Sequence, residues 1–273
     1  MITGWRERVG QARANGDYLH FGLDDPRCRD TRLVGAELAA LAGMADRAPV
    51  PGTDVITAPL AVWRRNPWTR STSPPLPFTG QAGVPLSIRC RLLVSDVDRS
   101  GESVWQNPAW NNIDPEAVWE GVVELAGIAA RQVVGDVSGH RLAFSLQRFV
   151  PAVASLLVWV ADSGHRVHVR ACRGLAETHA DRLYFDRFEF RGPSLVVEHC
   201  LVERKHTATV PADGGTHTVD VPPEQVSCPV LSVAAARSLA ASSRTWTAGY
   251  DGCAELEVVL VGQEFTLLDY RRL

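Results

Sequence analysis

The spacing of apolar residues changes along the chain and predicts helices and strands in a mixed order. Apolar positions recur at helical spacing over residues 30–44, which predicts a helix. Alternation of apolar and polar positions over 85–96 predicts a strand. A second helix is predicted from 114 to about 134, because an aspartate followed by proline suits a helix start. The polar segments 64–85 and 98–114 are expected to be loops.

The second half of the chain is richer in predicted strands. Alternating patterns predict strands over 141–148, 154–161, 166–172, 184–190 and 195–209. Gly214-Gly215 marks a hairpin turn, and a helix is expected over 231–243. The chain closes with a predicted hairpin of two strands, 254–261 and 264–270. This order predicts an α+β architecture rather than repeated βαβ units.

Size and charge narrow the class of protein. The chain has 273 residues, which suits one large unit or two small domains. Its 28 basic and 31 acidic residues give a net charge of −3, so no general attraction to nucleic acid or to an anionic membrane is expected. No apolar run reaches the roughly 18 residues that span a bilayer, and the polar start, 1–11, does not resemble a secretory signal. We expect a cytoplasmic protein that binds neither nucleic acid nor membrane.

Common nucleotide and metal motifs are absent from the sequence. It has no P-loop, no G-x-G-x-x-G after a strand and no H-E-x-x-H. The six cysteines are scattered without a C-x-x-C pair, so they are interpreted as buried or free thiols. The single lysine is Lys205, and any chemistry that needs a lysine depends on it.

Acidic residues in the closing hairpin form the candidate metal site. Glu255 and Glu257 are two residues apart, so they share one face of their strand. Asp269 lies on the neighbouring strand, and Arg271 shares its face. Carboxylates on adjacent strands suit Mg²⁺, which takes one or two of them together with phosphate oxygens. An arginine beside them can hold a phosphate. The alternative interpretation is a solvated hairpin with alternating charges.

The two closing segments resemble the end of one ATP-grasp family. Residues 250–257 and 265–273 are similar to the D-I-E-W strand and the L-L-Q-x-R-P strand of the nucleotide-binding domain of phosphoenolpyruvate synthase, pyruvate phosphate dikinase and rifampin phosphotransferase. Further segments resemble motifs of this family in the same order: 35–41, 50–52, 87–90, 144–150, 173–177, 181–184 and 223–232. The resemblance spans roughly Thr31 to Leu273.

The resemblance implies a fold and a pair of cofactors. The expected fold is α+β and ATP-grasp-like, with two subdomains, 1–140 and 141–273, and a nucleotide cleft between them. The expected cofactors are ATP and Mg²⁺. The implied function is an ATP-dependent phosphotransferase, or an ATP-grasp ligase. It would act on a small-molecule acceptor or on a separate phosphohistidine carrier, since the domains that follow in the family do not follow here.

The resemblance also implies residue roles. The family's magnesium ligands fall on Glu257 and Asp269. Glu255, two residues before Glu257, is included as a third candidate metal ligand. Its adenine-binding segment falls on Gln147, Phe149 and Val150.

Three basic residues complete the implied site. Arg89 and Arg271 match arginines that contact phosphate in the family. Lys205 matches a lysine that recurs in the family's late β region, and it is assigned with the cofactor-binding residues.

The sequence departs from the family pattern at three places. The family's opening lysine falls on Val34, a glutamate expected near the nucleotide falls on Arg170, and a glycine-rich loop falls near Trp105. Loss of the lysine and the loop would weaken the positioning of a transferring phosphoryl group. The alternative function is therefore a catalytically degenerate ATP-grasp module that serves as a binding or partner subunit.

Overall fold

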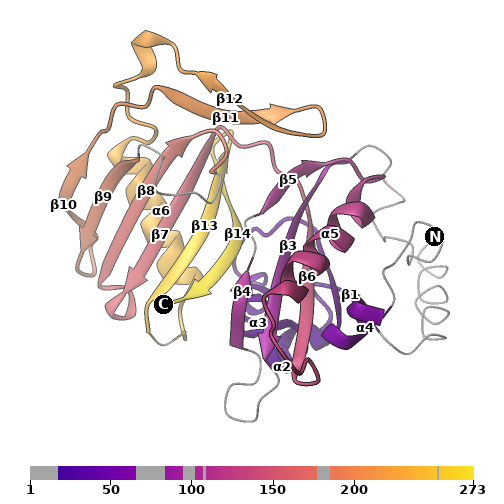
Figure 1. The fold of residues 1–273 in the computed structure, drawn as a ribbon. Helices are drawn as coiled ribbons and strands as arrows, with labels where there is room; N and C mark the ends of the chain where they lie inside the picture. The colour runs from indigo at the N-terminus through magenta and orange to yellow at the C-terminus, as the bar shows by residue number, and fades with distance from the viewer. Residues whose placement is uncertain (1–17, 66–83, 95–101, 107–108, 177–184, 251) are drawn as a thin grey trace, which may run out of the picture. The chain divides into compact units, whose positions relative to one another are not determined.

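The chain forms two compact units in the computed structural model (Figure 1). The structure describes residues 18–65, 84–94, 102–106, 109–176, 185–250 and 252–273. The first unit contains 1–39 and 52–149, and the second contains 40–51 and 150–273. The boundary expected after residue 140 lies instead after Phe149, because the strand His140–Arg148 pairs within the first unit.

The first unit is built on a six-stranded antiparallel sheet. Its spatial order is β1 (Leu19–Gly22), β2 (Thr53–Pro59), β6 (His140–Arg148), β3 (Leu86–Val94) and β4 (Glu102–Gln106), with β5 (Trp110–Ile113) also paired to β3. The strands expected over 85–96 and 141–148 are confirmed as β3 and β6. The loop expected over 98–114 is wrong, because parts of it pair with β3 as β4 and β5. Pairing to a neighbouring strand overrides a weak local pattern there. The loop expected over 64–85 lies almost wholly outside the described residues.

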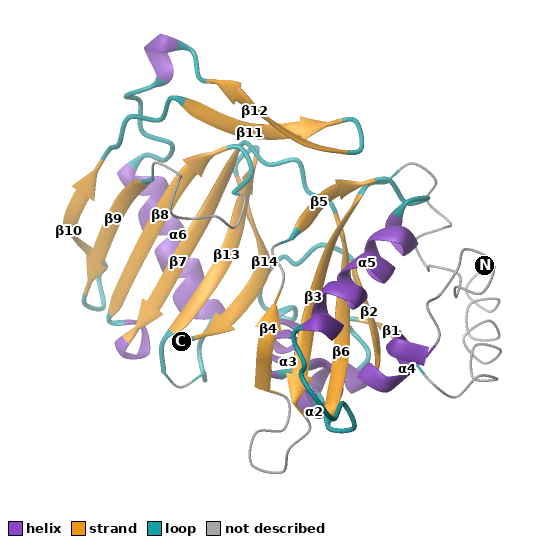
Figure 2. Cartoon of the chain, in the orientation of Figure 1, coloured by secondary structure: helices purple, strands orange, loops and turns teal. Residues whose placement is uncertain are grey.

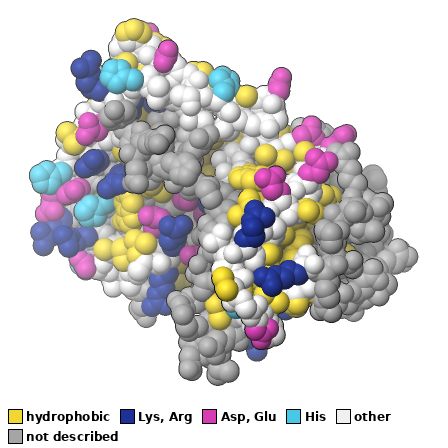
Figure 3. Space-filling view, in the orientation of Figure 1, with side chains coloured by type: hydrophobic (Ala, Val, Ile, Leu, Met, Phe, Trp, Pro, Cys, Tyr) yellow, Lys and Arg dark blue, Asp and Glu magenta, His cyan; other side chains and the backbone are white. Residues whose placement is uncertain are grey.

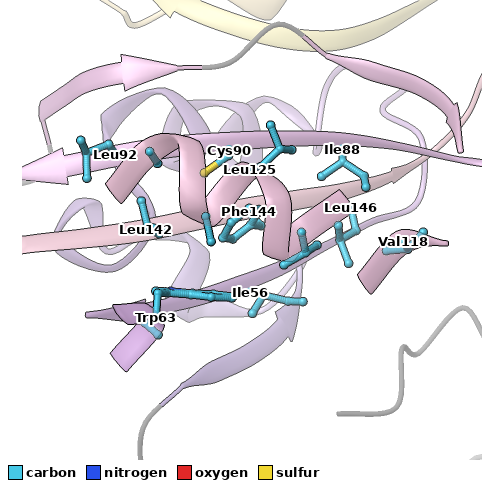
Figure 4. Packing of buried hydrophobic residues seen from close by; sticks show 14 of the residues in the cluster. Ile56, Trp63, Ile88, Cys90, Leu92, Val118, Leu125, Leu142, Phe144 and Leu146 are labelled. Atoms are coloured by element: carbon cyan, nitrogen blue, oxygen red, sulfur yellow. The ribbon is translucent and has the colours of Figure 1, made fainter. Parts of the chain in front are cut away.

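Two helices cover one face of this sheet and enclose its apolar core. They are α4 (Leu60–Arg65) and α5 (Val118–Arg131). Figure 4 shows apolar side chains of the central strands packed beneath α5, and Phe144 lies 5.0 Å from Trp63 between ring centres. The start of α5 is later than expected, since Asp114 accepts a hydrogen bond from the Glu116 N–H in a turn before the helix.

Two short helices replace the single helix expected over 30–44. They are α2 (Thr31–Val34) and α3 (Ala36–Met44). Gly35 separates them with a φ of 87°, a left-handed conformation that favours glycine. The hydroxyl of Thr57 on β2 donates to the carbonyl of Leu33 at 2.6 Å, which attaches α2 to the face of the sheet opposite α5.

The second unit contains another six-stranded antiparallel sheet. Its order is β10 (Val196–Leu201), β9 (Asp186–Arg191), β8 (Arg166–Arg173), β7 (Ala154–Ala161), β13 (Ala254–Val261) and β14 (Glu264–Arg272). The five strands β7, β8, β9, β13 and β14 confirm the predicted ones. The single strand expected over 195–209 is wrong: β10 ends at Leu201, and β11 (Thr207–Ala212) pairs with β12 (Gly215–Asp220) in a separate hairpin.

One helix covers one face of the second sheet. This helix, α6 (Val233–Trp246), is capped by Ser232, whose side chain accepts the Ala235 N–H, as expected for a helix N-cap. It contacts β7, β8 and β9 and lies behind the sheet in Figure 2. We call the face of the sheet opposite α6 the open face. No helix among the described residues is both long and apolar enough to cross a membrane.

An early segment of the chain, 40–51, belongs to the second unit. The Leu267 N–H of β14 donates to the Pro49 carbonyl at 2.8 Å. Arg47 donates to the Ala248 carbonyl at 2.8 Å, and the Tyr250 hydroxyl donates to the Ala40 carbonyl at 3.1 Å. These bonds join the segment to β14 and to the turn after α6.

Candidate functional site

Charged residues on the open face lie in two rows that cross the second sheet. Directly opposed residues of antiparallel strands project to the same face, so the strand register defines each row. The first row contains Asp269, Glu257, Leu157, Arg170 and Arg187. The second row contains Arg271, Glu255, Trp159, His168 and Glu189. Figure 3, which looks onto this face, shows charged side chains of both signs over its strands.

A β-bulge places the two expected magnesium ligands opposite each other. Glu257 of β13 pairs with Asp269 of β14, whereas the next residue, Val258, pairs with Leu267. Leu268 is therefore the extra residue of a bulge, which bends the strand and shifts its register. Because of this shift, Asp269 shares the open face with Glu257 instead of facing α6. Asp269 is buried, and Glu257 is partly exposed.

The third expected metal ligand has a different partner. Glu255 lies opposite Arg271, and its Oε1 is 3.6 Å from the arginine Nη1. The Arg271 side chain remains 47% exposed. An ion pair of this exposure contributes about 0–1 kcal/mol, so Arg271 can exchange Glu255 for another anion at little cost.

The acidic end of the first row has two carboxylates, Glu257 and Asp269, at opposed positions of neighbouring strands. Among the described residues, no group of three or more histidine, cysteine or acidic side chains is placed to hold a metal. Mg²⁺ needs only one or two protein carboxylates when substrate phosphates supply other ligands. Glu257 and Asp269 supply two carboxylates. The described residues do not form a metal site made of protein ligands alone.

Lys205 lies in a buried ion pair. Its side chain is 2% exposed and that of Asp186 is fully buried. The ammonium contacts Asp186 Oδ1 and donates to the Glu203 carbonyl at 2.6 Å. Asp186 also accepts the backbone N–H groups of Glu203, at 3.1 Å, and of Val230, at 2.6 Å. The ammonium group is therefore bound by Asp186 and by the Glu203 carbonyl. This gives Lys205 a structural role that could not be predicted from the sequence.

In the first unit, Arg89 and Gln147 lie on the polar face of its sheet. Arg89 is opposite Ser145, and Gln147 donates to the Thr53 hydroxyl at 3.2 Å. All four residues are buried. Their face is the one opposite the apolar core, since they alternate along their strands with core residues.

A second buried arginine on this polar face is one that the sequence left open as a replacement for the family lysine missing at Val34. Arg91 is fully buried, lies 3.4 Å from Glu37 Oε2 and donates to the Ser145 hydroxyl at 3.3 Å. The only signal was the segment Arg89-Cys90-Arg91 within a strand, in which the two arginines must share a face.

Phe149 and Val150 lie where the first unit ends and the second begins. The Phe149 N–H donates to the Pro85 carbonyl at 2.9 Å. Val34, at the position of the family's opening lysine, is fully buried in α2.

Comparison with known proteins gives structural likeness only. No protein-family model and no curated protein matches the chain. Similar solved structures include D-alanine–D-alanine ligase from Bacillus anthracis, with 9% identity, a TM-score of 0.40 and coverage of 97% of this chain and 64% of that one. The ATP-grasp ligase PsnB complexed with a minimal precursor has 9% identity, a TM-score of 0.30 and coverage of 91% and 54%. The chain thus spans less than two thirds of these proteins, and TM-scores below 0.5 do not establish a common fold.

Proposed function

We propose that this protein is an ATP- and Mg²⁺-dependent phosphotransferase or ligase with an ATP-grasp fold, and that its chemistry takes place on the open face of the second sheet. The observation that carries the proposal is the bulged pairing of Glu257 with Asp269, two residues from Arg271. Carboxylates that bind magnesium and an arginine that binds phosphate form a consistent set for phosphoryl transfer.

Each residue has a defined task in this proposal. Glu257 and Asp269 hold the magnesium ion, which when bound neutralises charge on the phosphates. Arg271 leaves its exposed pairing with Glu255 and binds a phosphate oxygen. Glu255 pairs with Arg271 in the protein without ligand and remains the third proposed metal ligand once Arg271 has left it.

On the sequence resemblance to the phosphoenolpyruvate synthase group, Gln147, Phe149 and Val150 remain the proposed adenine-binding residues, and Arg89 remains a proposed phosphate contact. Lys205 is left out of nucleotide binding because its ammonium is buried against Asp186. The acceptor is a small molecule or a separate phosphohistidine carrier.

A thermal-shift titration with Mg-ATP tests the proposal. At a hundredfold excess over Kd, binding stabilises the folded state by about 2.7 kcal/mol. That corresponds to roughly 5–11 °C, at roughly 2–4 °C per kcal/mol for a chain of this size. Glu257→Ala and Asp269→Ala should each remove most of the shift, because each deletes one of the side-chain oxygen ligands proposed to hold the ion.

The matched control lies in the same hairpin. Glu264→Gln changes an exposed carboxylate next to the turn and should leave the shift intact. Chelation of magnesium with EDTA should reduce the shift of the unaltered protein to the level of the two variants. If the unaltered protein shows no shift with Mg-ATP, or if both variants retain it, the proposed function is wrong.

A further inference from the structure

Two arginines at the other end of the first row suggest a second binding site on the open face. Arg170 of β8 and Arg187 of β9 are direct cross-strand neighbours. Like charges at directly opposed positions destabilise a sheet. Such a pair is therefore expected where an anion lies between or above the two guanidinium groups.

Neighbouring arginines on the same two strands have acidic partners. Arg166 lies 3.7 Å from Asp162, and Arg191 lies 3.3 Å from Glu198. Within the described part of the chain, neither Arg170 nor Arg187 has a carboxylate at ion-pair distance. One arginine pair on these two strands therefore has acidic side chains beside it, and among the described residues the pair Arg170 and Arg187 has none.

An aromatic ring fixes the position of Arg170. Its guanidinium carbon lies 4.8 Å above the centre of the Trp159 ring, a cation–π contact that holds an arginine without using its N–H donors. The planar fork therefore keeps its donors for an oxyanion, and carboxylate and phosphate match its geometry. Arg187 is exposed beside it and can supply a second set of donors.

The first row consequently has an acidic end and a basic end. Leu157 separates Glu257 from Arg170, so these two residues are two strand spacings apart, or about 10 Å. We propose that Arg170 and Arg187 bind an oxyanion of the acceptor substrate, a carboxylate or a phosphate, on the same face as the magnesium-bound nucleotide. This inference rests on the proposed function for the identity of the neighbouring ligand.

Calorimetric titration with inorganic phosphate, in the presence of saturating Mg-ADP, tests the inference. Phosphate should bind the unaltered protein, and Arg170→Gln and Arg187→Gln should each weaken its binding about tenfold or more, as expected for the loss of a charge-assisted hydrogen bond. Arg166→Gln is the matched control on the same strand and face, and it should change the phosphate affinity by less than about twofold because Arg166 has its own acidic partner.

Mg-ADP binding by the same variants separates the possible sources of the anion. If Mg-ADP affinity is unchanged while phosphate binding is lost, the anion belongs to the acceptor, as proposed. If Mg-ADP and phosphate binding fall together, the two arginines bind the nucleotide's own phosphates and the inference is overturned. It is also overturned if both variants bind phosphate as the unaltered protein does.

Failure of the proposed function gives a different result. If the unaltered protein does not bind Mg-ADP, yet phosphate alone binds and depends on Arg170 and Arg187, the anion site is supported and the nucleotide assignment is wrong. Melting temperatures of the variants without ligand should stay close to that of the unaltered protein, because both side chains lie on the open face rather than in the core.

Discussion

Replacement of Lys205 by methionine separates a structural role from a role in nucleotide binding. The ammonium and the Asp186 carboxylate are both buried, and Asp186 also accepts two backbone N–H groups. Lys205→Met would leave that carboxylate buried without its cation. Removal of one partner of a buried ion pair typically costs about 3–5 kcal/mol.

The loss should be visible in both chemical and thermal unfolding. At roughly 2–4 °C per kcal/mol for a chain of this size, a loss of about 3–5 kcal/mol lowers the melting temperature by roughly 6–20 °C. The double variant Lys205→Met with Asp186→Asn should recover at least half of the lost free energy, since the buried charge is gone and the amide oxygen can still accept a backbone hydrogen bond. Equilibrium urea unfolding of the single and double variants measures both quantities.

Two outcomes would refute this reasoning. A loss below about 1 kcal/mol in Lys205→Met would show that the pair is not a buried structural contact. A folded variant that binds Mg-ATP at least about tenfold more weakly, at nearly unchanged stability, would restore the nucleotide role that the sequence resemblance implied.

Two further predictions concern stability. Burial, and then the charge of Asp24, raises the pKa of Asp54 to about 7, so stability should fall as the pH rises from about 4 to about 7. Asp54→Asn should remove this fall in unfolding midpoints measured across that range, and a parallel pH dependence in both proteins would contradict it. Gly174 has a φ of 70°, and a Cβ there would collide with the Thr209 carbonyl. Gly174→Ala should therefore lower the free energy of unfolding more than Gly192→Ala does. Gly192 has a φ of 75° and open space where a Cβ would lie, so Gly192→Ala should lower the free energy of unfolding by only about 1–2 kcal/mol. Equal losses in urea unfolding would refute the collision.

The sequence predicted strands well where one face of the strand is buried. Alternation is clear in β7 and β8, because every second residue packs under α6, and these strands appear where they were expected. The same logic could not find β4 or β5, which are short, show no clear alternation and are held by pairing to β3. It also joined α2 to α3, since helical spacing continues through Gly35 even though the backbone turns there.

The candidate site depends on register, which local patterns do not reveal. A regular two-residue hairpin around Gly262-Gln263 would pair Glu257 with Leu268 and turn Asp269 towards α6. Only the bulge at Leu268 brings the two carboxylates to the same face. The residue types of β14 do not predict this bulge. The pairing of Arg170 with Arg187 likewise depends on the register between β8 and β9.

The hydrogen-bond partners of Lys205 could not be predicted from the sequence either. A resemblance can match Lys205 to a family position, but it cannot show that Asp186 and the carbonyl of Glu203 surround the ammonium. Burial and hydrogen bonding at that position follow from the packing of distant segments.

The participation of 40–51 in the second unit has a consequence for synthesis of the chain. Ala40 and Arg47 bond to residues that follow them by 210 and 201 positions, so this segment leaves the ribosome long before its partners exist. The polypeptide passes between the two units three times, at 39/40, 51/52 and 149/150. A chain that stops at Phe149 would therefore contain the segment 40–51, which belongs to the second unit. The second half produced alone would lack this segment, which bonds to the edge strand β14. Any attempt to express the halves separately should transfer that short segment to the second one.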